Sequence, residues 1–214
     1  MQLEPLREIV CKCNQELPKN DLVKMTSGNV SGRDPETGLV VIKPSGVSFE
    51  DLTPAHMVVV DMDCRVVEGD LKPSTDTDTH LYVYRHRPDI FGMVHTHSPY
   101  ASSFAVLGQP IPACLTASAM LGGEIPLGGY APIGGADIGQ EIIDKIGRAR
   151  AIIMQSHGVF TIGSSPQQAT KMAIEVEEIA KIAHLALSRG EPILLSESQI
   201  DYMVDLYQNR YGQR

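Results

Sequence analysis

The chain opens with apolar residues spaced three and four positions apart. Spacing of this kind places side chains on one face of a helix, so the first part of the sequence is predicted to form an amphipathic helix. A second helix is predicted to begin near Thr77 and to end before Pro88, because proline interrupts helical hydrogen bonding. The apolar positions of the first helix are Leu3, Leu6, Ile9, Val10, Cys13 and Leu17.

The longest helical pattern lies late in the chain. Ser165 is placed to cap it, Pro166 suits its first turn, Gln168 is expected to complete a capping box, and Gly190 ends it. A last helix is predicted from its cap at Ser196 to about Tyr207. The apolar stripe of the long helix comprises Ala169, Met172, Ala173, Val176, Ile179, Ala180, Ala183 and Leu187.

Short runs rich in β-branched residues predict strands at 38–46, 56–69, 92–98 and 149–163. The second run is expected to fold back at 62–64, and the last at 156–158. Strands and helices are mixed without a strict alternation. The predicted fold is therefore an α/β fold, a layered α/β/α domain around a largely antiparallel central sheet, formed by residues 1–214 as a single domain.

Composition narrows the classes of function. The chain has 214 residues, of which 43% are hydrophobic, enough for one sizeable core. Its formal net charge of −8 argues against nucleic acid or an anionic membrane as a partner. No apolar run approaches the roughly 20 residues that span a bilayer, and the N-terminus lacks the pattern of a signal peptide. A cytoplasmic protein with reduced cysteines is expected.

Two histidines, His95 and His97, lie one residue apart in a predicted strand. Residues two apart in a strand share a face, which suits two imidazoles on one cation. His157, at the turn of another strand pair, supplies a third nitrogen, and Asp76, just before a helix, is the candidate carboxylate. Three histidines with a carboxylate or water complete a tetrahedral zinc site.

The same histidines also permit a reading without metal, in which the pair marks an exposed strand face and His157 is a lone loop residue. Spacing alone leaves both readings open. The other four histidines lack comparable partners and are expected on helix faces or at the surface. They are His56, His80, His86 and His184.

Two segments, "MTSGNVSGR" at 25–33 and "KPSG" at 43–46, combine small hydroxyl residues with glycine. Such turns expose successive backbone N–H groups that bind anions. Ser74 and Thr75 add hydroxyls beside Asp76, and Lys43 and Lys72 add positive charge. Together these features predict a phosphate bound within reach of the metal.

Five segments carry a resemblance to a known family. They are "SGNVSGR", "VVIKPSG", "KPSTDTDTH", "VHTHSPYA" and "QSHGVF", in this order along nearly the whole chain. In this respect the sequence resembles the class II aldolase/adducin family, which includes L-fuculose-1-phosphate aldolase and L-ribulose-5-phosphate 4-epimerase. The resemblance favours the metal reading of the histidines.

The resemblance implies roles for individual residues. His95, His97 and His157 match the zinc histidines of the family, and Asp76 matches its acidic zinc ligand or base. The implied reaction is retro-aldol cleavage of a phosphorylated ketose through an enediolate that the metal stabilises. The positions that match its phosphate-binding residues are Asn29, Ser45, Gly46, Ser74 and Thr75.

The resemblance leaves aldolase and epimerase open. Asp76 in place of glutamate, and the ending "NRYGQR", favour an epimerase, whose acid/base tyrosine from a neighbouring subunit matches Tyr211, with Tyr207 as the substitute. Against this, the segment 111–126 contains neither an aspartate nor a histidine, and an epimerase needs acid/base groups on both faces of the aldehyde. We therefore expect an aldolase, with the 4-epimerase as the alternative.

Other uses of the scaffold also remain: a decarboxylase or dehydratase of a phosphorylated sugar, and a metal-free, adducin-like interaction module. The three histidines and the carboxylate argue against the metal-free module. By resemblance, a homotetramer with active sites between subunits is expected, as are Zn²⁺ or another divalent metal as cofactor and a sugar phosphate as substrate.

Overall fold

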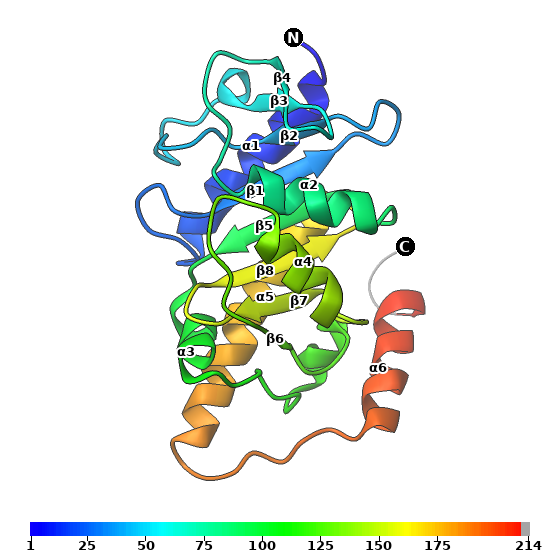
Figure 1. Ribbon diagram of the computed structural model, residues 1–214. Helices are drawn as coiled ribbons and strands as arrows, with labels where there is room; N and C mark the ends of the chain where they lie inside the picture. The colour runs from blue at the N-terminus through cyan, green and yellow to red at the C-terminus, as the bar shows by residue number, and fades with distance from the viewer. Residues whose placement is uncertain (211–214) are drawn as a thin grey trace.

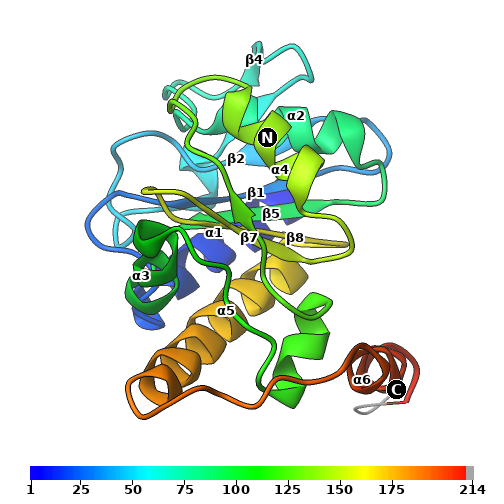
Figure 2. The same cartoon turned by 60° about the horizontal axis from the view of Figure 1, so that its bottom comes forward.

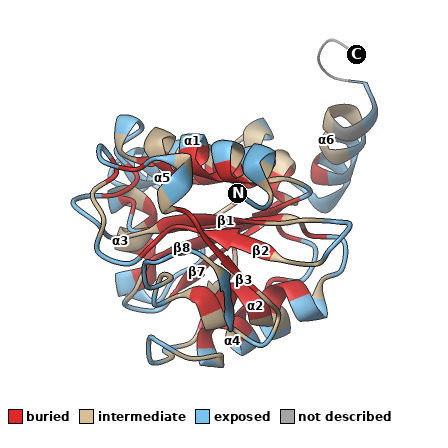
Figure 3. Cartoon of the chain, turned by 90° about the horizontal axis from the view of Figure 1, so that it is seen from above, coloured by how far each residue is buried: buried red, intermediate tan, exposed pale blue. Residues whose placement is uncertain are grey.

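The computed structural model describes residues 1–210, apart from the side chain of Gln208. Its centre is an eight-stranded sheet in the order β4-β3-β2-β1-β5-β8-β7-β6, with helices on both faces (Figure 1; Figure 3). All neighbouring strands are antiparallel except β6 and β7, which are parallel. The predicted α/β fold around a largely antiparallel sheet is confirmed.

The helices and strands have the following bounds. The strands are β1 (Asn29–Arg33), β2 (Val40–Ile42), β3 (Val58–Val60), β4 (Val66–Glu68), β5 (Gly92–Thr96), β6 (Leu127–Gly128), β7 (Ala151–Met154) and β8 (Val159–Gly163). The helices are α1 (Glu4–Lys19), α2 (Thr77–His86), α3 (Pro99–Leu107), α4 (Asp137–Lys145), α5 (Pro166–Leu187) and α6 (Glu197–Asn209), with short 3-10 turns η1 (Pro54–His56) and η2 (Thr116–Leu121).

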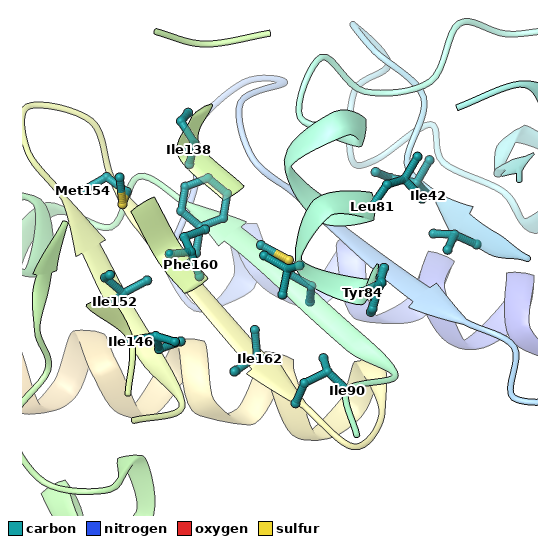
Figure 4. Packing of buried hydrophobic residues seen from close by; sticks show 14 of the residues in the cluster. Ile42, Leu81, Tyr84, Ile90, Ile138, Ile146, Ile152, Met154, Phe160 and Ile162 are labelled. Carbon is teal, nitrogen blue, oxygen red and sulfur yellow. The ribbon is translucent and has the colours of Figure 1, made fainter. Parts of the chain in front are cut away.

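The sheet buries both of its faces. Helices α1 and α5 cover one face and α2 and α4 cover the other (Figure 3). Successive strand residues therefore belong to different cores: Val41 packs beneath α1, whereas Val40 and Ile42 pack beneath α2 and α4. Figure 4 shows the second core, where Tyr84 and Leu81 of α2 lie over the strands together with Phe160 and Ile162 of β8.

A row of glycines crosses the sheet where α5 begins. Gly32, Gly92 and Gly163 pair with one another across β1, β5 and β8. A Cβ atom at Gly92 would lie 2.2 Å from the carbonyl carbon of Ser165, and one at Gly32 would lie 2.7 Å from the Pro166 ring. Glycine is required in this row because the N-terminus of α5 rests directly on the strands.

Arg7 joins α1 to the outer strands. Its guanidinium is almost fully buried, donates to the carbonyl of Met57 and lies 3.2 Å from the carboxylate of Glu68 in β4. The same carboxylate accepts a hydrogen bond from the backbone of Gln2 at 2.7 Å. The start of the chain is thus fastened to the edge of the sheet.

Helix α6 stands apart from the layered body (Figure 1; Figure 2). It contacts the body through Ile200, which packs against Ala113 and against Ala119 of η2. Arg148 adds two exposed ion pairs to α6, at 2.6 Å to Glu197 and 2.9 Å to Asp201. Among the described residues, no helix is both long and apolar enough to cross a membrane.

The predicted helices at the start, middle and end of the chain are confirmed, as is the cap at Ser165, which accepts from the backbone of Gln168. The predicted capping box is wrong in one detail. The side-chain oxygen of Gln168 accepts from the backbone of Ser164 at 2.6 Å, rather than from that of the cap residue. The box at the last helix, between Ser196 and Gln199, is complete.

The prediction that the whole segment 25–33 is a turn is wrong. Its second half is strand β1, in the centre of the sheet. Short polar residues on a buried face hide the strand, because Asn29 and Ser31 point to α2 and bond to its polar side chains. Helices α3 and α4 and strand β6 were not anticipated from the pattern.

Replacement of Gly92 by alanine is expected to lower the free energy of unfolding by about 1–3 kcal/mol, because the new Cβ would overlap the backbone of Ser165. Denaturant titration measures the change. Gly135→Ala is the matched control, since a Cβ there meets nothing within 4 Å. Equal stability of the two variants would contradict the required contact.

Candidate active site

Three histidines converge at one end of the sheet, as predicted. His95 belongs to β5, His97 follows the strand directly, and His157 comes from the turn between β7 and β8. One nitrogen from each lies within 4.8 Å of the others. The ring centroid of His95 is 4.7 Å from those of both His97 and His157. Strand β5 ends at Thr96, one residue earlier than the shared-face argument assumed.

The ring of His95 is fixed by its neighbours in the sheet. Strand pairing sets it opposite Phe160, whose ring stacks on it at 4.2 Å between centroids and an angle of 12°. Its Nδ1 lies 3.0 Å from the carbonyl oxygen of Val159. A carbonyl only accepts, so Nδ1 carries the hydrogen and Nε2 keeps the lone pair that a metal needs.

The turn that carries His157 is unusually tight. Ser156 adopts a left-handed conformation with φ of 56°, and the backbone of His157 donates to the carbonyl of Met154 at 3.0 Å. Gly158 then passes so close to the histidines that a Cβ atom would lie 2.4 Å from the carbonyl oxygen of Thr96. Glycine is required here because any side chain would push His157 away from its partners.

Burial keeps the three imidazoles neutral. It lowers the pKa of His95 to about 3, and it also lowers the pKa values of His97 and His157 below the ordinary histidine range. The carboxylate of Asp76 opposes this effect without reversing it. Neutral imidazoles are the form that binds metals, so the site is ready for a cation at neutral pH.

The residues present fit a divalent metal. Three neutral imidazoles lie at ligand spacing, and Nδ1 of His157 is buried without a hydrogen-bond partner among the described residues. Three histidines that leave a fourth position open are typical of catalytic zinc sites. Asp76 is not part of this histidine cluster, so its role as a metal ligand stays a prediction.

Asp76 is held by Asn29. The side-chain nitrogen of Asn29 donates to Oδ2 of Asp76 at 2.6 Å and to the hydroxyl of Ser74 at 3.0 Å. Burial disfavours the ionised carboxyl, but the electrostatic effect of His95 and the bond from Asn29 favour it, and the pKa of Asp76 is lowered overall. Asp76 is therefore a carboxylate at neutral pH.

A pocket of about 300 Å³ opens over the histidines and brings the predicted residues together. Thr26, Ser27, Gly28, Lys43, Pro44 and Ile133 complete its lining. Lys72, which was expected to add charge, is exposed and does not line it. The predicted residues in the lining are Asn29, Ser45, Gly46, Ser74, Thr75, Asp76, His95, His97 and His157.

The loop at 43–46 is joined by backbone hydrogen bonds to the loop at 72–75, which carries Ser74 and Thr75. Ser45 donates to the carbonyl of Lys72 at 2.9 Å, and Ser74 donates to that of Lys43 at 3.0 Å. The glycines at 28 and 46 have φ of 88° and 72°, which turn their loops around the pocket. The pairing holds the hydroxyls of both loops at one end of the pocket, where an oxyanion can bind.

Lys43 connects two of the loops that line the pocket. Its buried ammonium donates to the carbonyls of Thr26 and Pro44 at 3.3 Å each and lies 4.7 Å from the centre of the Phe49 ring. Burial lowers the pKa of Lys43 to about 8. The lysine thus ties the loop at 26–28 to the loop at 44–46.

The expected acid/base tyrosine is not among the residues that the structure describes. Tyr211 lies outside the described residues. Tyr207, its substitute, packs with Ile200 in the small cluster between α6 and η2 and does not line the pocket of its own chain. The segment 111–126, which contains Thr116 and Glu124, contributes no residue to the lining either.

The sequence pattern did not predict the positions of two side chains near the site. His80 was expected on a helix face or at the surface, and it is on helix α2 but fully buried. Glu177 of α5 accepts from the backbones of Tyr100 and Ala101 at 2.9 Å each and so caps α3 immediately after His97. A histidine four residues after Asp76 was the available signal for the first, whereas the second depends on a contact across 76 residues.

Comparison with known proteins identifies a family that this chain matches. The family described as "Class II Aldolase and Adducin N-terminal domain" matches residues 8–184. An L-fuculose 1-phosphate aldolase structure is 31% identical, with a TM-score of 0.93, and the match covers 97% of this chain and 98% of the other.

Two further structures extend the comparison. YgbL from Escherichia coli, described as a candidate aldolase, epimerase or decarboxylase, is 25% identical with a TM-score of 0.83, over 94% of this chain and 98% of its own. The L-fuculose-1-phosphate aldolase from Thermus thermophilus is 24% identical with a TM-score of 0.74, over 88% of this chain and 98% of its own, and supports the fold alone.

Purified protein is expected to carry about one zinc or similar divalent ion per chain. His95→Ala should lose most of this metal, because it removes the most buried of the three imidazoles. Elemental analysis by mass spectrometry measures the content. His86→Ala, at an exposed histidine of α2, should keep its metal, and full occupancy in the His95 variant would sink the assignment.

Proposed function

Because the chain belongs to the class II aldolase and adducin family, we propose that it is a metal-dependent aldolase that cleaves a phosphorylated ketose by retro-aldol chemistry. The observation that carries the proposal is one pocket lined by both the three histidines and the glycine and hydroxyl residues of two paired loops. A ketose phosphate needs both features, since its phosphate and its reacting carbonyl lie a few bonds apart.

The phosphate is bound by the loop residues. Asn29, Ser45, Gly46, Ser74 and Thr75 supply hydroxyl, amide and backbone donors around one end of the pocket. The buried Lys43 holds these loops and adds positive charge close behind them. A phosphate fixed there orients the rest of the substrate toward the histidines.

His95, His97 and His157 hold the metal, with Asp76 beside them. When bound, zinc or another divalent metal would supply a Lewis acid for the negative charge that develops as the carbon–carbon bond breaks. His95 is neutral and buried, which gives the inner side of the site the water-poor surroundings in which such stabilisation is strongest.

Asp76 is the group that moves the proton. Its Oδ2 is engaged by Asn29, which leaves Oδ1 to accept the proton of the C4 hydroxyl as the bond to C3 breaks. The phenol of Tyr211, supplied by a neighbouring subunit, provides the second acid/base group. The phosphate lies at the opposite end of the pocket from these two groups.

The absence of a second carboxylate favours an aldolase over a 4-epimerase. Asp76 is the acidic residue in the described pocket lining, and Glu124 lies outside that lining. An epimerase must turn the aldehyde and add it back, which calls for acid/base groups on both of its faces. Asp76 and Tyr211 are both used in the cleavage, and the described lining has no further acidic residue for the other face, so the aldehyde leaves as product.

Zinc-loaded protein is expected to release dihydroxyacetone phosphate and a small aldehyde from a suitable ketose 1-phosphate. Asp76→Asn should lower kcat by about 100-fold or more, since it removes the proton acceptor. A coupled assay that reduces dihydroxyacetone phosphate with NADH follows the release. The control is Asp89→Asn, at an exposed aspartate outside the pocket.

A panel of ketose 1-phosphates and 5-phosphates separates the candidate reactions. Interconversion of L-ribulose 5-phosphate and D-xylulose 5-phosphate without fragments would replace the aldolase by the epimerase. Release of carbon dioxide from a phosphorylated sugar acid would replace it by a decarboxylase. Binding of metal without turnover of any sugar phosphate would contradict all three enzymatic assignments.

The proposed homotetramer places Tyr211 of one subunit in the site of its neighbour. Asp76→Asn and Tyr211→Phe should each be nearly inactive as pure oligomers. Coexpressed in equal amounts, they should regain activity in about a quarter of the sites, because random assembly joins the two intact residues there. The proposal fails if coexpression restores nothing while each variant stays oligomeric by analytical ultracentrifugation.

A further inference from the structure

Helix α2 and strand β1 face each other through a column of polar side chains. Asp76, His80 and Tyr84 are spaced four residues apart, so they lie along one face of the helix. Asn29 and Ser31 are two apart in β1 and share a face of the strand. Asn29 bonds to Asp76, and Ser31 bonds to both His80 and Tyr84.

The inner part of the column is sealed from solvent. His80, Ser31 and Tyr84 all have no exposed surface. The hydroxyl of Ser31 lies 2.7 Å from Nδ1 of His80 and 2.8 Å from the hydroxyl of Tyr84. Figure 4 shows Tyr84 on α2 among the apolar side chains of this core, which offer it no polar partner of their own.

The direction of these hydrogen bonds follows from the number of hydrogens. Ser31 has one hydroxyl hydrogen and two partners, so it donates to one and accepts from the other. If it donated to Tyr84, the phenolic hydrogen would have no acceptor among the described residues. Tyr84 therefore donates to Ser31, and Ser31 donates to Nδ1 of His80.

This direction fixes the tautomer of His80. Burial lowers its pKa to about 4, so the ring is neutral and carries one hydrogen. Because Nδ1 accepts from Ser31, that hydrogen resides on Nε2 at the other edge of the ring. Nε2 is buried and has no hydrogen-bond partner among the described residues, and the charged group that acts on the ring is the Asp76 carboxylate.

We propose that His80 is a positioning residue, which as the Nε2–H tautomer presents a fixed donor to the Asp76 side of the site. The inference rests on the proposed role of Asp76 as proton acceptor. The electrostatic effect of His80 favours the ionised form of Asp76, while Asn29 holds the carboxylate from the side of β1. Oδ1 of Asn29, the residue that bonds to Asp76, is likewise buried without a hydrogen-bond partner among the described residues, and as an acceptor it suits a donor from His80.

The opposite tautomer would place a lone pair toward a carboxylate and leave a phenolic hydrogen unpaired in the core. Both effects raise the energy of the buried column. The hydroxyls of Ser31 and Tyr84 thus affect the active site indirectly, because their hydrogen bonds determine which nitrogen of the His80 ring carries the hydrogen. Neither of them touches the pocket itself.

Nitrogen NMR tests the tautomer without any substrate. Zinc-loaded protein labelled with ¹³C and ¹⁵N is measured by magic-angle-spinning NMR, with His80 assigned through backbone correlations. The expected spectrum shows a protonated Nε2 and an unprotonated Nδ1 at His80. A protonated Nδ1, or a doubly protonated ring at pH 7, would overturn the proposal even if the protein proves to be an aldolase.

Two amide substitutions separate the positioning role from a packing role. In His80→Gln the side-chain nitrogen can occupy the place of Nε2 and keep the donor toward Asp76. In His80→Asn the amide reaches only the place of Nδ1, so it keeps the contact with Ser31 and loses that donor. A purely structural role would be served at least as well by asparagine, which preserves the inner bond.

The proposal expects His80→Asn to lower kcat by about 10- to 100-fold, as loss of a supporting hydrogen bond commonly does, with KM and zinc content little changed. His80→Gln should retain most of kcat, and His86→Gln on the same helix should be silent. Equal kcat for the glutamine and asparagine variants would reject the positioning role. The spectrum of the wild-type protein decides the tautomer should either variant fail to fold.

Discussion

The register between β1, β5 and β8 is the constraint on which the candidate site depends. It sets Asn29, His95 and Phe160 side by side across three strands, on the sheet face that α2 covers. A slip by one residue would turn all three to the face beneath α1 and α5. The glycine row at Gly32, Gly92 and Gly163 belongs to the same register and seats the N-terminus of α5. The packing of α5 on one end of the strands thus fixes the positions of the site residues at the other end.

Burial of so many polar groups requires that their partners be fixed in advance. The histidines are kept neutral by desolvation, and the one carboxylate among them is held by Asn29. Lys43 is matched to two carbonyls and an aromatic ring. Each group therefore enters the site with its orientation and charge already decided by the scaffold, which is the condition for electrostatic preorganisation. Glu177, through its cap on α3, extends this control to the segment that follows His97.

Much of this arrangement was accessible from the sequence, because its signals are local. Periodic apolar residues and caps located α1, α5 and α6, and the spacing of His95 and His97 with His157 pointed to one cluster. Strand β1 escaped because its buried face is polar. The burial and tautomer of His80 could not be predicted, because they depend on hydrogen bonds of Ser31 to His80 and to Tyr84. These bonds join residues that are 49 and 53 positions apart. The proposed role of Tyr211 depends on assembly, which the pattern of one chain does not encode.

The fastening of the N-terminus has a consequence for colloidal behaviour. Strand β4 is the outer edge of the sheet, and Val66 and Val67 are about half exposed there. An open apolar edge invites other strands to add to it. Here the edge is only three residues long, and Glu68 within it is occupied by Arg7 and the backbone of Gln2. Helix α1 therefore also protects the sheet against edge-to-edge aggregation, a role separate from its packing beneath the strands.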